Sequence, residues 1–242
     1  ETRLSTFAEE TATAKASASS PFINVKDPTY GAKGDGTTDD AAAIQAAITS
    51  LVTRGGTIYF PPGTYLCLST IIMTQGIYLV GSGMADQGNG FATAIKKKEN
   101  GLLIDMSGSS TEIHFKYGGI RDMTLEGNSK TGSLLRTYYA DDLTFERLNF
   151  ASNKGRALDA VELWDTRFDN ITSNNCGGES GTEPAFHFRS TAATEGFGHS
   201  TDNTNQCYLK NFRIESWRDG AIWIESGGEP FNGPLGMFLD NI

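Results

Sequence analysis

The sequence is poor in cysteine and in proline, and each shortage limits the kinds of fold that the chain can adopt. Its 242 residues hold three cysteines, Cys67, Cys176 and Cys207, an odd number without the spacing of zinc ligands. They predict reduced, packed thiols rather than a disulfide framework. The 7 prolines stand against 28 glycines, a balance that suits an all-β chain with many tight turns.

Positive charge is scarce, and long apolar runs are absent. The 20 Lys and Arg residues face 29 Asp and Glu residues, for a formal net charge of -9. Because an acidic surface repels a phosphate backbone, we expect no nucleic-acid partner. No run approaches the ~18 apolar residues of a membrane span, so none is expected. No signal peptide is visible, but the chain begins at Glu1 rather than Met, which leaves a removed leader open.

The first 20 residues differ from the rest, since they are rich in Ala, Ser and Thr and lack glycine. Apolar and small residues recur there at the 3-4-3-4 spacing of a coiled-coil seam: Leu4, Phe7, Thr11, Ala14 and Ala18. Small residues on such a seam would let helices approach closely. Residues 1–20 therefore predict a short helical neck, with a flexible linker as the alternative.

One convincing helix is predicted in the body of the chain, after a short strand at residues 22–26. Capping side chains and early acidic charge stand at residues 37–40. An apolar face follows at i, i+3, i+4 and i+7: Ile44, Ala47, Ile48 and Leu51. Arg54-Gly55-Gly56 ends the pattern. We expect a helix over residues 40–52 that covers the N-terminal end of the next domain, with residues 21–56 forming the cap.

Two repeated elements organise residues 57–242. The first reads apolar, two polar or charged, apolar, and it recurs as Ile120-Arg121-Asp122-Met123, Phe145-Glu146-Arg147-Leu148, Phe168-Asp169-Asn170-Ile171, Leu209-Lys210-Asn211-Phe212 and Leu239-Asp240-Asn241-Ile242. The second is a short strand after a turn, at residues 100–105, 131–136, 154–159, 183–188 and 219–224. Alternating strand elements with a period above 20 residues predict a solenoid of stacked parallel coils. The Leu and Asn ladder of leucine-rich repeats is absent, and a β-sandwich would show hairpin turns.

The stretch Asn24–Asp40, with its Tyr30-Gly31-Ala32-Lys33-Gly34-Asp35-Gly36 run, resembles the opening of the pectate-lyase superfamily of right-handed parallel β-helices. Residues 55–65 continue the resemblance, and Pro28-Thr29 lengthens its usual short link. The resemblance implies an all-β right-handed parallel β-helix with an N-terminal capping helix and a short helical neck. It also implies that Asp35, Asp39 and Asp40 are turn and cap residues rather than catalytic acids.

This opening occurs in bacteriophage tailspikes, in pectin and glucan hydrolases and in some epimerases, and an Ala-rich lead-in before it is similar to a trimeric tailspike neck. The chain stops within a repeat at residues 239–242, so we expect the coils to be C-terminally incomplete. The resemblance implies a tailspike depolymerase, located on the virion tail, that binds and cleaves a capsule, exopolysaccharide or lipopolysaccharide glycan. The alternatives are a secreted cellular enzyme that degrades pectin or glucan, and a non-catalytic glycan-binding tail adhesin.

Outward side chains of the second element predict the site, because equivalent residues on successive coils lie ~4.8 Å apart. The predicted column runs through Asp105, Arg136, Asp159, then His187 or Arg189, then Trp223 or Glu225. Hydrolysis needs two carboxyl groups, ~5–9.5 Å apart, and elimination needs a base and cations; hydrolysis is slightly favoured. The candidate catalytic residues are Glu225, Asp219, His187 and Asp159, with Arg189, Trp223 and Trp217 as substrate-binding residues. No cofactor or metal site is predicted.

The seam at residues 4–18 predicts a homotrimer for the longer protein that keeps residues 1–20 and the further coils. Light scattering of that protein is expected to give the mass of three chains. A monomer would contradict the prediction. A monomer of residues 1–242 alone would not, since tailspike trimers often depend on C-terminal contacts.

Overall fold

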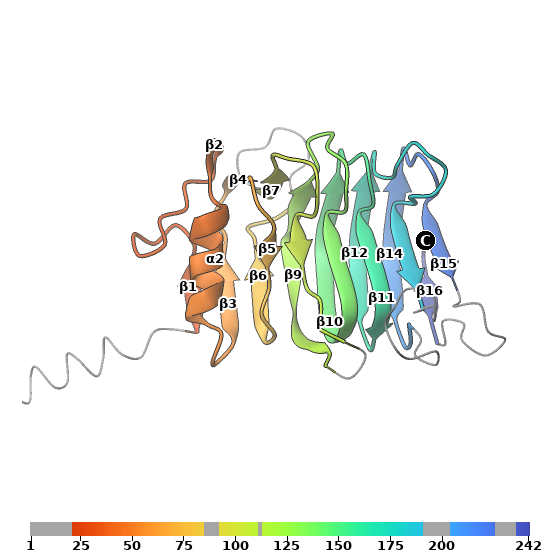
Figure 1. The fold of residues 1–242 in the computed structure, drawn as a ribbon, viewed down its shortest axis with the longest axis horizontal. Helices are drawn as coiled ribbons and strands as arrows, with labels where there is room; N and C mark the ends of the chain where they lie inside the picture. Colours follow the sequence, from red (N-terminus) through yellow and green to blue (C-terminus); the bar gives the residue numbers. More distant parts are fainter. Residues whose placement is uncertain (1–20, 85–91, 111–112, 191–203, 226–235) are drawn as a thin grey trace, which may run out of the picture.

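A computed structural model describes residues 21–84, 92–110, 113–190, 204–225 and 236–242. The strands stack along the long axis of the molecule, from β1 at one end to β15 and β16 at the other (Figure 1). Every pairing between the strands of these residues is parallel. Antiparallel hairpins between Phe145 and Ile171, the outcome that would have contradicted the predicted fold, do not occur.

The pairings form three ladders. Ladder A joins β5 (Ile71–Ile72), β8 (Ile104–Asp105), the first part of β10 (Leu135–Ala151), β11 (Leu158–Trp164), β13 (Phe186–Arg189) and β15 (Ile222–Glu225). Ladder B joins β1 (Phe22–Asn24), β3 (Gly56–Tyr59), β6 (Ile77–Val80) and β16 (Phe238–Asp240) with parts of β9 (Phe115–Glu126), β10, β12 (Arg167–Asn174) and β14 (Tyr208–Glu215). Ladder C joins β2 (Asp35–Asp39), β4 (Gly63–Cys67) and β7 (Thr93–Lys97) to the last parts of β9, β10, β12 and β14. Each full coil therefore runs through A, then B, then C.

A single left-handed residue turns the chain from ladder B into ladder C. On the coils from β9 onwards it is the third residue of the first repeated element: Asp122, Arg147, Asn170, Asn211 and Asn241, with φ between 48° and 59°. Asn and Asp adopt this conformation more readily than most residues. The bend lets both apolar residues of the element point inward, and Phe145 and Leu148 are fully buried on its two sides. This geometry explains the apolar–polar–polar–apolar pattern.

Neighbouring residues on this B–C corner attract one another from coil to coil. The Arg147 guanidinium binds both carboxylate oxygens of Asp122. The Asn211 amide donates to Asp169 Oδ1 at 2.8 Å, and the Asn241 amide donates to Asn211 Oδ1 at 2.8 Å. These side-chain contacts run parallel to the backbone ladder and fix the register of the coils.

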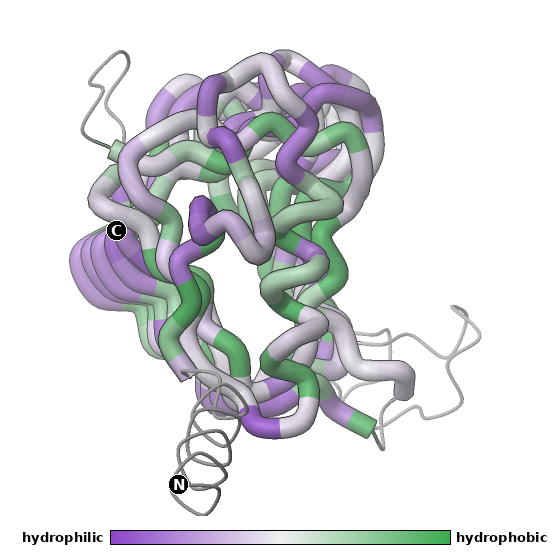
Figure 2. The backbone as a smooth tube through the Cα atoms, turned by 90° about the vertical axis from the view of Figure 1, so that its left-hand side faces the viewer, coloured by the Kyte–Doolittle hydropathy of each residue, from purple (hydrophilic) through white to green (hydrophobic). Residues whose placement is uncertain are grey.

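The hydrophobic core runs inside the coils from Ile23 to Phe212. Seen along the axis, the coils superpose on one another (Figure 2). Aromatic side chains stack within the core, as Phe145 does on Phe168 with 4.8 Å between ring centroids. The core continues across the predicted boundary between residues 56 and 57, so the division into a cap and coils stays a prediction.

The predicted helix is present as α2 (Ala41–Ser50), beside the first strands of the stack (Figure 1). Ile44, Ala47 and Ile48 are buried in the core, as the spacing predicted. The Asp40 carboxylate does not cap the helix; it accepts the backbone N–H groups of Lys33 and Gly34 at 2.6 and 2.9 Å. Asp40 therefore holds the preceding loop, which is a turn role.

The predicted neck at residues 1–20 lies outside the described residues. The thiols of Cys67, Cys176 and Cys207 are free and buried, as predicted. No helix in the described parts is long and apolar enough to cross a membrane.

The substitution Asn211→Ala tests the B–C corner. It removes two amide hydrogen bonds and leaves a less suitable residue in the left-handed conformation, so we expect a loss of roughly 2 kcal/mol in the free energy of unfolding. Urea denaturation measures the loss. Lys210→Ala, on the exposed side of the same strand, is the control and is expected to change little. Equal effects of the two substitutions would contradict a special role for the corner.

Candidate functional site

Pairing on ladder A settles the register of the predicted column. Asp105 pairs with Arg136, Arg136 with Asp159, Asp159 with His187 and His187 with Trp223. Arg189 and Glu225 pair with each other in the next outward row. The column is therefore Asp105, Arg136, Asp159, His187 and Trp223. Arg189 and Glu225 flank it, and the two rows together make one polar face.

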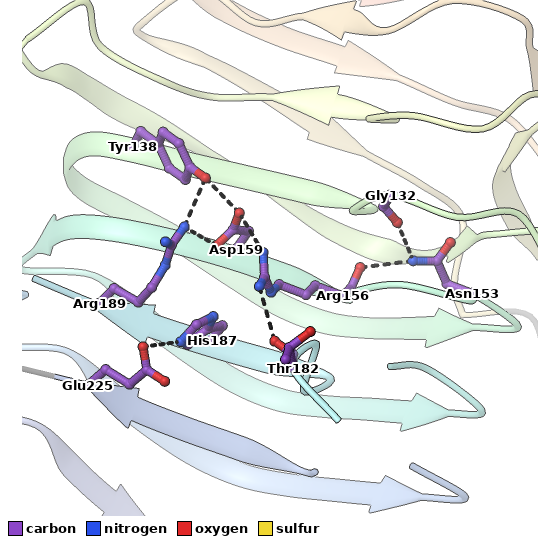
Figure 3. Close-up of polar contacts among 9 residues, drawn as sticks. All are labelled: Gly132, Tyr138, Asn153, Arg156, Asp159, Thr182, His187, Arg189 and Glu225. Atoms are coloured by element: carbon purple, nitrogen blue, oxygen red, sulfur yellow. Dashed lines mark hydrogen bonds and ion pairs between the residues drawn. The ribbon is translucent and has the colours of Figure 1, made fainter. Parts of the chain in front are cut away.

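Asp159 is the centre of this face, and it is covered although it was predicted to point outward. Asp159 is only 5% exposed, because three side chains cover and bind its carboxylate. Tyr138 donates to Oδ2 at 2.6 Å, Arg156 to Oδ2 at 3.2 Å and Arg189 to Oδ1 at 2.9 Å (Figure 3). Both oxygens are thus engaged, which holds two guanidinium groups in fixed positions.

Tyr138 joins the hydrogen bonds to the aromatic packing of the face. Its hydroxyl also accepts a bond from Arg189 at 3.0 Å, and the Arg136 guanidinium lies 5.2 Å from its ring centroid. Burial, followed by the charge of Asp159, raises the pKa of Tyr138 well above its usual range, so the phenol keeps its proton. Sequence reasoning missed Tyr138 and Arg156. The signal for Tyr138 was its place two residues after Arg136 on the same strand.

His187 and Glu225 form the second part of the face. Nε2 of His187 lies 2.9 Å from Oε2 of Glu225, an ion-pair distance, although the angle departs from that of a good hydrogen bond. The histidine side chain is 5% exposed and the glutamate side chain is 48% exposed. Glu225 therefore reaches solvent, while the buried His187 lies next to its carboxylate (Figure 3).

Burial lowers the pKa of His187, and the charges of Arg189 and Arg156 act in the same direction, while Glu225 opposes both. The imidazole is therefore biased towards its neutral form at neutral pH. A neutral imidazole beside an accessible carboxylate can accept or relay a proton, which is the basic requirement of acid–base catalysis.

Trp223 extends the polar face by one coil. Its indole packs edge-on against His187, with 5.9 Å between ring centroids. Gly220 gives the indole room, because a Cβ there would lie 2.4 Å from Nε1 of Trp223. Trp223 is therefore placed beside the histidine–glutamate pair, as a ring-stacking residue would be.

Two of the candidate residues lie apart from this cluster. The Asp219 carboxylate accepts the backbone N–H groups of Thr182 and Glu183 at 3.2 and 3.0 Å, so it organises a loop. Slight burial raises the pKa of Asp219, but the backbone N–H groups of Glu183, Gly181 and Thr182 outweigh it and lower the pKa. Trp217 is 54% exposed in the connection between β14 and β15.

Comparison with known proteins gives three findings. A protein-family model described as rhamnogalacturonase A/epimerase, pectate lyase-like, matches residues 22–102. Alginate lyase 7 of Azotobacter vinelandii is 37% identical over 113 residues, covering 43% of this chain and 12% of the lyase. Mannuronan C5-epimerase AlgE4 of the same organism is 34% identical over 158 residues, covering 57% of this chain and 28% of the epimerase.

Among solved structures, ORF18 of Geobacillus virus E2 superposes with a TM-score of 0.65 and 22% identity, over 89% of this chain and 42% of that one. This likeness concerns the fold. The chain spans less than a third of the length of both curated relatives.

Acidification is expected to destabilise the fold through His187. Because its pKa is lower folded than unfolded, the unfolded chain binds more protons between the two values, and stability falls as the pH drops through that window, from about 6.5 downwards. Calorimetry between neutral and mildly acidic pH measures the fall.

The variant His187→Gln should show a smaller fall, since it removes the titrating group. Glu225→Gln should show a larger one, because it removes the carboxylate that favours the imidazolium form. Identical pH dependence in all three proteins would show that His187 does not titrate as described.

Proposed function

We propose that the chain, whose residues 22–102 match a pectate lyase-like family model, is an enzyme that modifies a polysaccharide on the outer face of ladder A. The observation that carries the proposal is the His187–Glu225 pair, with Trp223 on one side and the two arginines of Asp159 on the other. The pair supplies proton transfer, the indole supplies a stacking surface and the guanidinium groups supply positive charge.

The hydrogen bonds of Asp159 bear on the choice of reaction. Hydrolysis by two carboxyl groups needs a second free carboxyl about 5–9.5 Å from the first. Asp159 is a poor candidate for it, since both oxygens are bound and nearly covered. Asp219 is engaged with backbone N–H groups. The face therefore favours proton abstraction over the two-carboxylate hydrolysis that the sequence slightly favoured.

Proton abstraction suits a uronic acid unit of the glycan. Arg189 or Arg156 would bind the sugar carboxylate and stabilise the negative charge that develops when the C5 proton is removed. Glu225 is the proposed base, and His187 would relay the proton that Glu225 accepts. Expulsion of the 4-linked oxygen then gives a lyase product, and return of a proton to the opposite face gives an epimer. The similarity to an alginate lyase and to a mannuronan C5-epimerase supports this chemistry.

The setting of the reaction is the surface of a bacterium. We propose that the chain belongs to a trimeric phage tailspike acting on capsule, exopolysaccharide or lipopolysaccharide, with α2 as the N-terminal cap of the coils. The support is the neck-like composition of residues 1–20 and the shared fold of the Geobacillus virus protein. A secretory leader in the longer protein would favour the secreted cellular enzyme instead.

The variant Glu225→Gln tests the catalytic assignment in the full-length protein. Removing a general base is expected to lower the rate on the natural glycan by ~10²–10⁴-fold. Glu215→Gln, on a different ladder, is the matched control and should keep the parental rate. Melting temperatures check that both variants fold.

A panel of glycans with three readouts separates the reactions: ultraviolet absorbance of unsaturated ends for elimination, deuterium uptake at C5 for epimerisation, and reducing ends without unsaturation for hydrolysis. A parental rate in Glu225→Gln would contradict the assignment. The reacting groups would then come from further coils or from a neighbouring subunit.

A further inference from the structure

A second polar site lies where ladder A turns into ladder B. A pocket of about 450 Å³ opens there, within the range of ~300–1,000 Å³ typical of small-ligand sites. Its polar lining comes from three coils: Asp142 and Thr144, then Asp165 and Arg167, then Gln206 and Tyr208. We call it the corner pocket. None of its lining residues belongs to the His187–Glu225 pair or to the side chains that bind Asp159, so the pocket is distinct from the ladder A face.

The corner pocket is built on a second column of left-handed residues. Asp142, Asp165 and Gln206 have φ of 55°, 44° and 51°, and each makes the turn from ladder A to ladder B on its coil. The pairings Asp141 with Trp164 and Thr144 with Arg167 place Asp142 and Asp165 at equivalent positions on adjacent coils. The two carboxylates are therefore carried on strands ~4.8 Å apart.

The left-handed column of the corner pocket differs from that of the B–C corner in the charges of its side chains, and the difference does not stabilise the fold. At the B–C corner the neighbouring side chains attract, through Arg147 with Asp122 and through the Asn211 and Asn241 amides. At the corner pocket two like charges are adjacent, which destabilises the fold. Slight burial, followed by the charges of Asp141 and Asp142, raises the pKa of Asp165, which is itself exposed. Asn would fit both positions without this cost.

Hydrogen-bonding groups in the corner pocket are open to a ligand. Neither the Asp142 nor the Asp165 carboxylate accepts a hydrogen bond or forms an ion pair within the described parts of the chain. Arg167 forms no ion pair there either; its guanidinium lies 5.8 Å from the ring centroid of Tyr208. Tyr208 in turn stacks on Phe238 with 4.8 Å between centroids, which fixes this wall of the pocket.

We infer that the corner pocket is a second carbohydrate-binding site, for an uncharged pyranose unit. Two carboxylates accept hydrogen bonds from adjacent hydroxyl groups, and Arg167 and Gln206 donate to sugar oxygens. The ring of Tyr208 packs against Arg167 and Phe238, so its hydroxyl rather than a ring face is offered to a sugar oxygen. Two acidic groups against one basic group disfavour an anionic unit, so this site selects differently from the arginine-bearing face of ladder A.

The double variant Asp142→Asn/Asp165→Asn tests the inference in the full-length protein. Binding is measured by saturation-transfer NMR and titration with the methyl glycosides of glucose, galactose, mannose, rhamnose and N-acetylglucosamine, with galacturonate as the anionic probe. We expect at least one neutral glycoside to bind and its affinity to fall at least tenfold in the double variant. The melting temperature should stay equal or rise, because the repulsion is removed.

Glu215→Gln is the matched control, and it should leave this binding unchanged, since that residue ends β14 and does not line the corner pocket. Failure of every neutral glycoside to bind, or equal binding by parent and double variant, would overturn the inference. A lower melting temperature of the double variant would also overturn it, because the two acids would then be structural. None of these results depends on whether Glu225 is catalytic.

Discussion

The structure depends on one constraint: each coil must place its corner residues directly over those of the coil before it. A left-handed residue at each corner changes the direction of the chain without breaking the parallel ladder. Side chains at the B–C corner reinforce the stacking by attraction between coils. Once the register is fixed, residues 20 to 40 positions apart in the sequence become direct neighbours. Asp159, His187 and Trp223 meet for this reason.

Much of the fold could be predicted because the constraint leaves a periodic trace in the sequence. The elements that contain Asp122, Asn170 and Asn211 show the apolar–polar–polar–apolar pattern, whose third residue is now explained by its left-handed backbone. The helix at Ala41–Ser50 follows the predicted face closely. Of the capping side chains expected at residues 37–40, Asp39 accepts the N–H of Ala41, whereas Asp40 binds the loop at Lys33 and Gly34.

From the sequence, the candidate site could be predicted only as a column of outward side chains on successive coils. Strand alternation identifies outward residues, and the register of Asp105, Arg136 and Asp159 followed from the repeat. Alternation does not tell which outward residues become covered, since that depends on long side chains such as Arg189 and Arg156 folding over Asp159. Asp219 and Trp217 lie in connections, where the period carries no information about direction. The central assignment of Glu225 therefore depends on contacts rather than on pattern.

Two surfaces with opposite charge character emerge on one scaffold. The face of ladder A gathers arginines around a buried carboxylate, while the corner pocket gathers free carboxylates around one arginine. We propose above all that Glu225 acts on a uronate unit held by the ladder A face. A crystal structure of the Glu225→Gln variant with a bound oligosaccharide of the natural glycan is the sharpest test. We expect a sugar ring against Trp223, its carboxylate on Arg189 or Arg156, and C5 next to residue 225. A glycan bound on another face, without contact to Trp223 or the arginines, would contradict it.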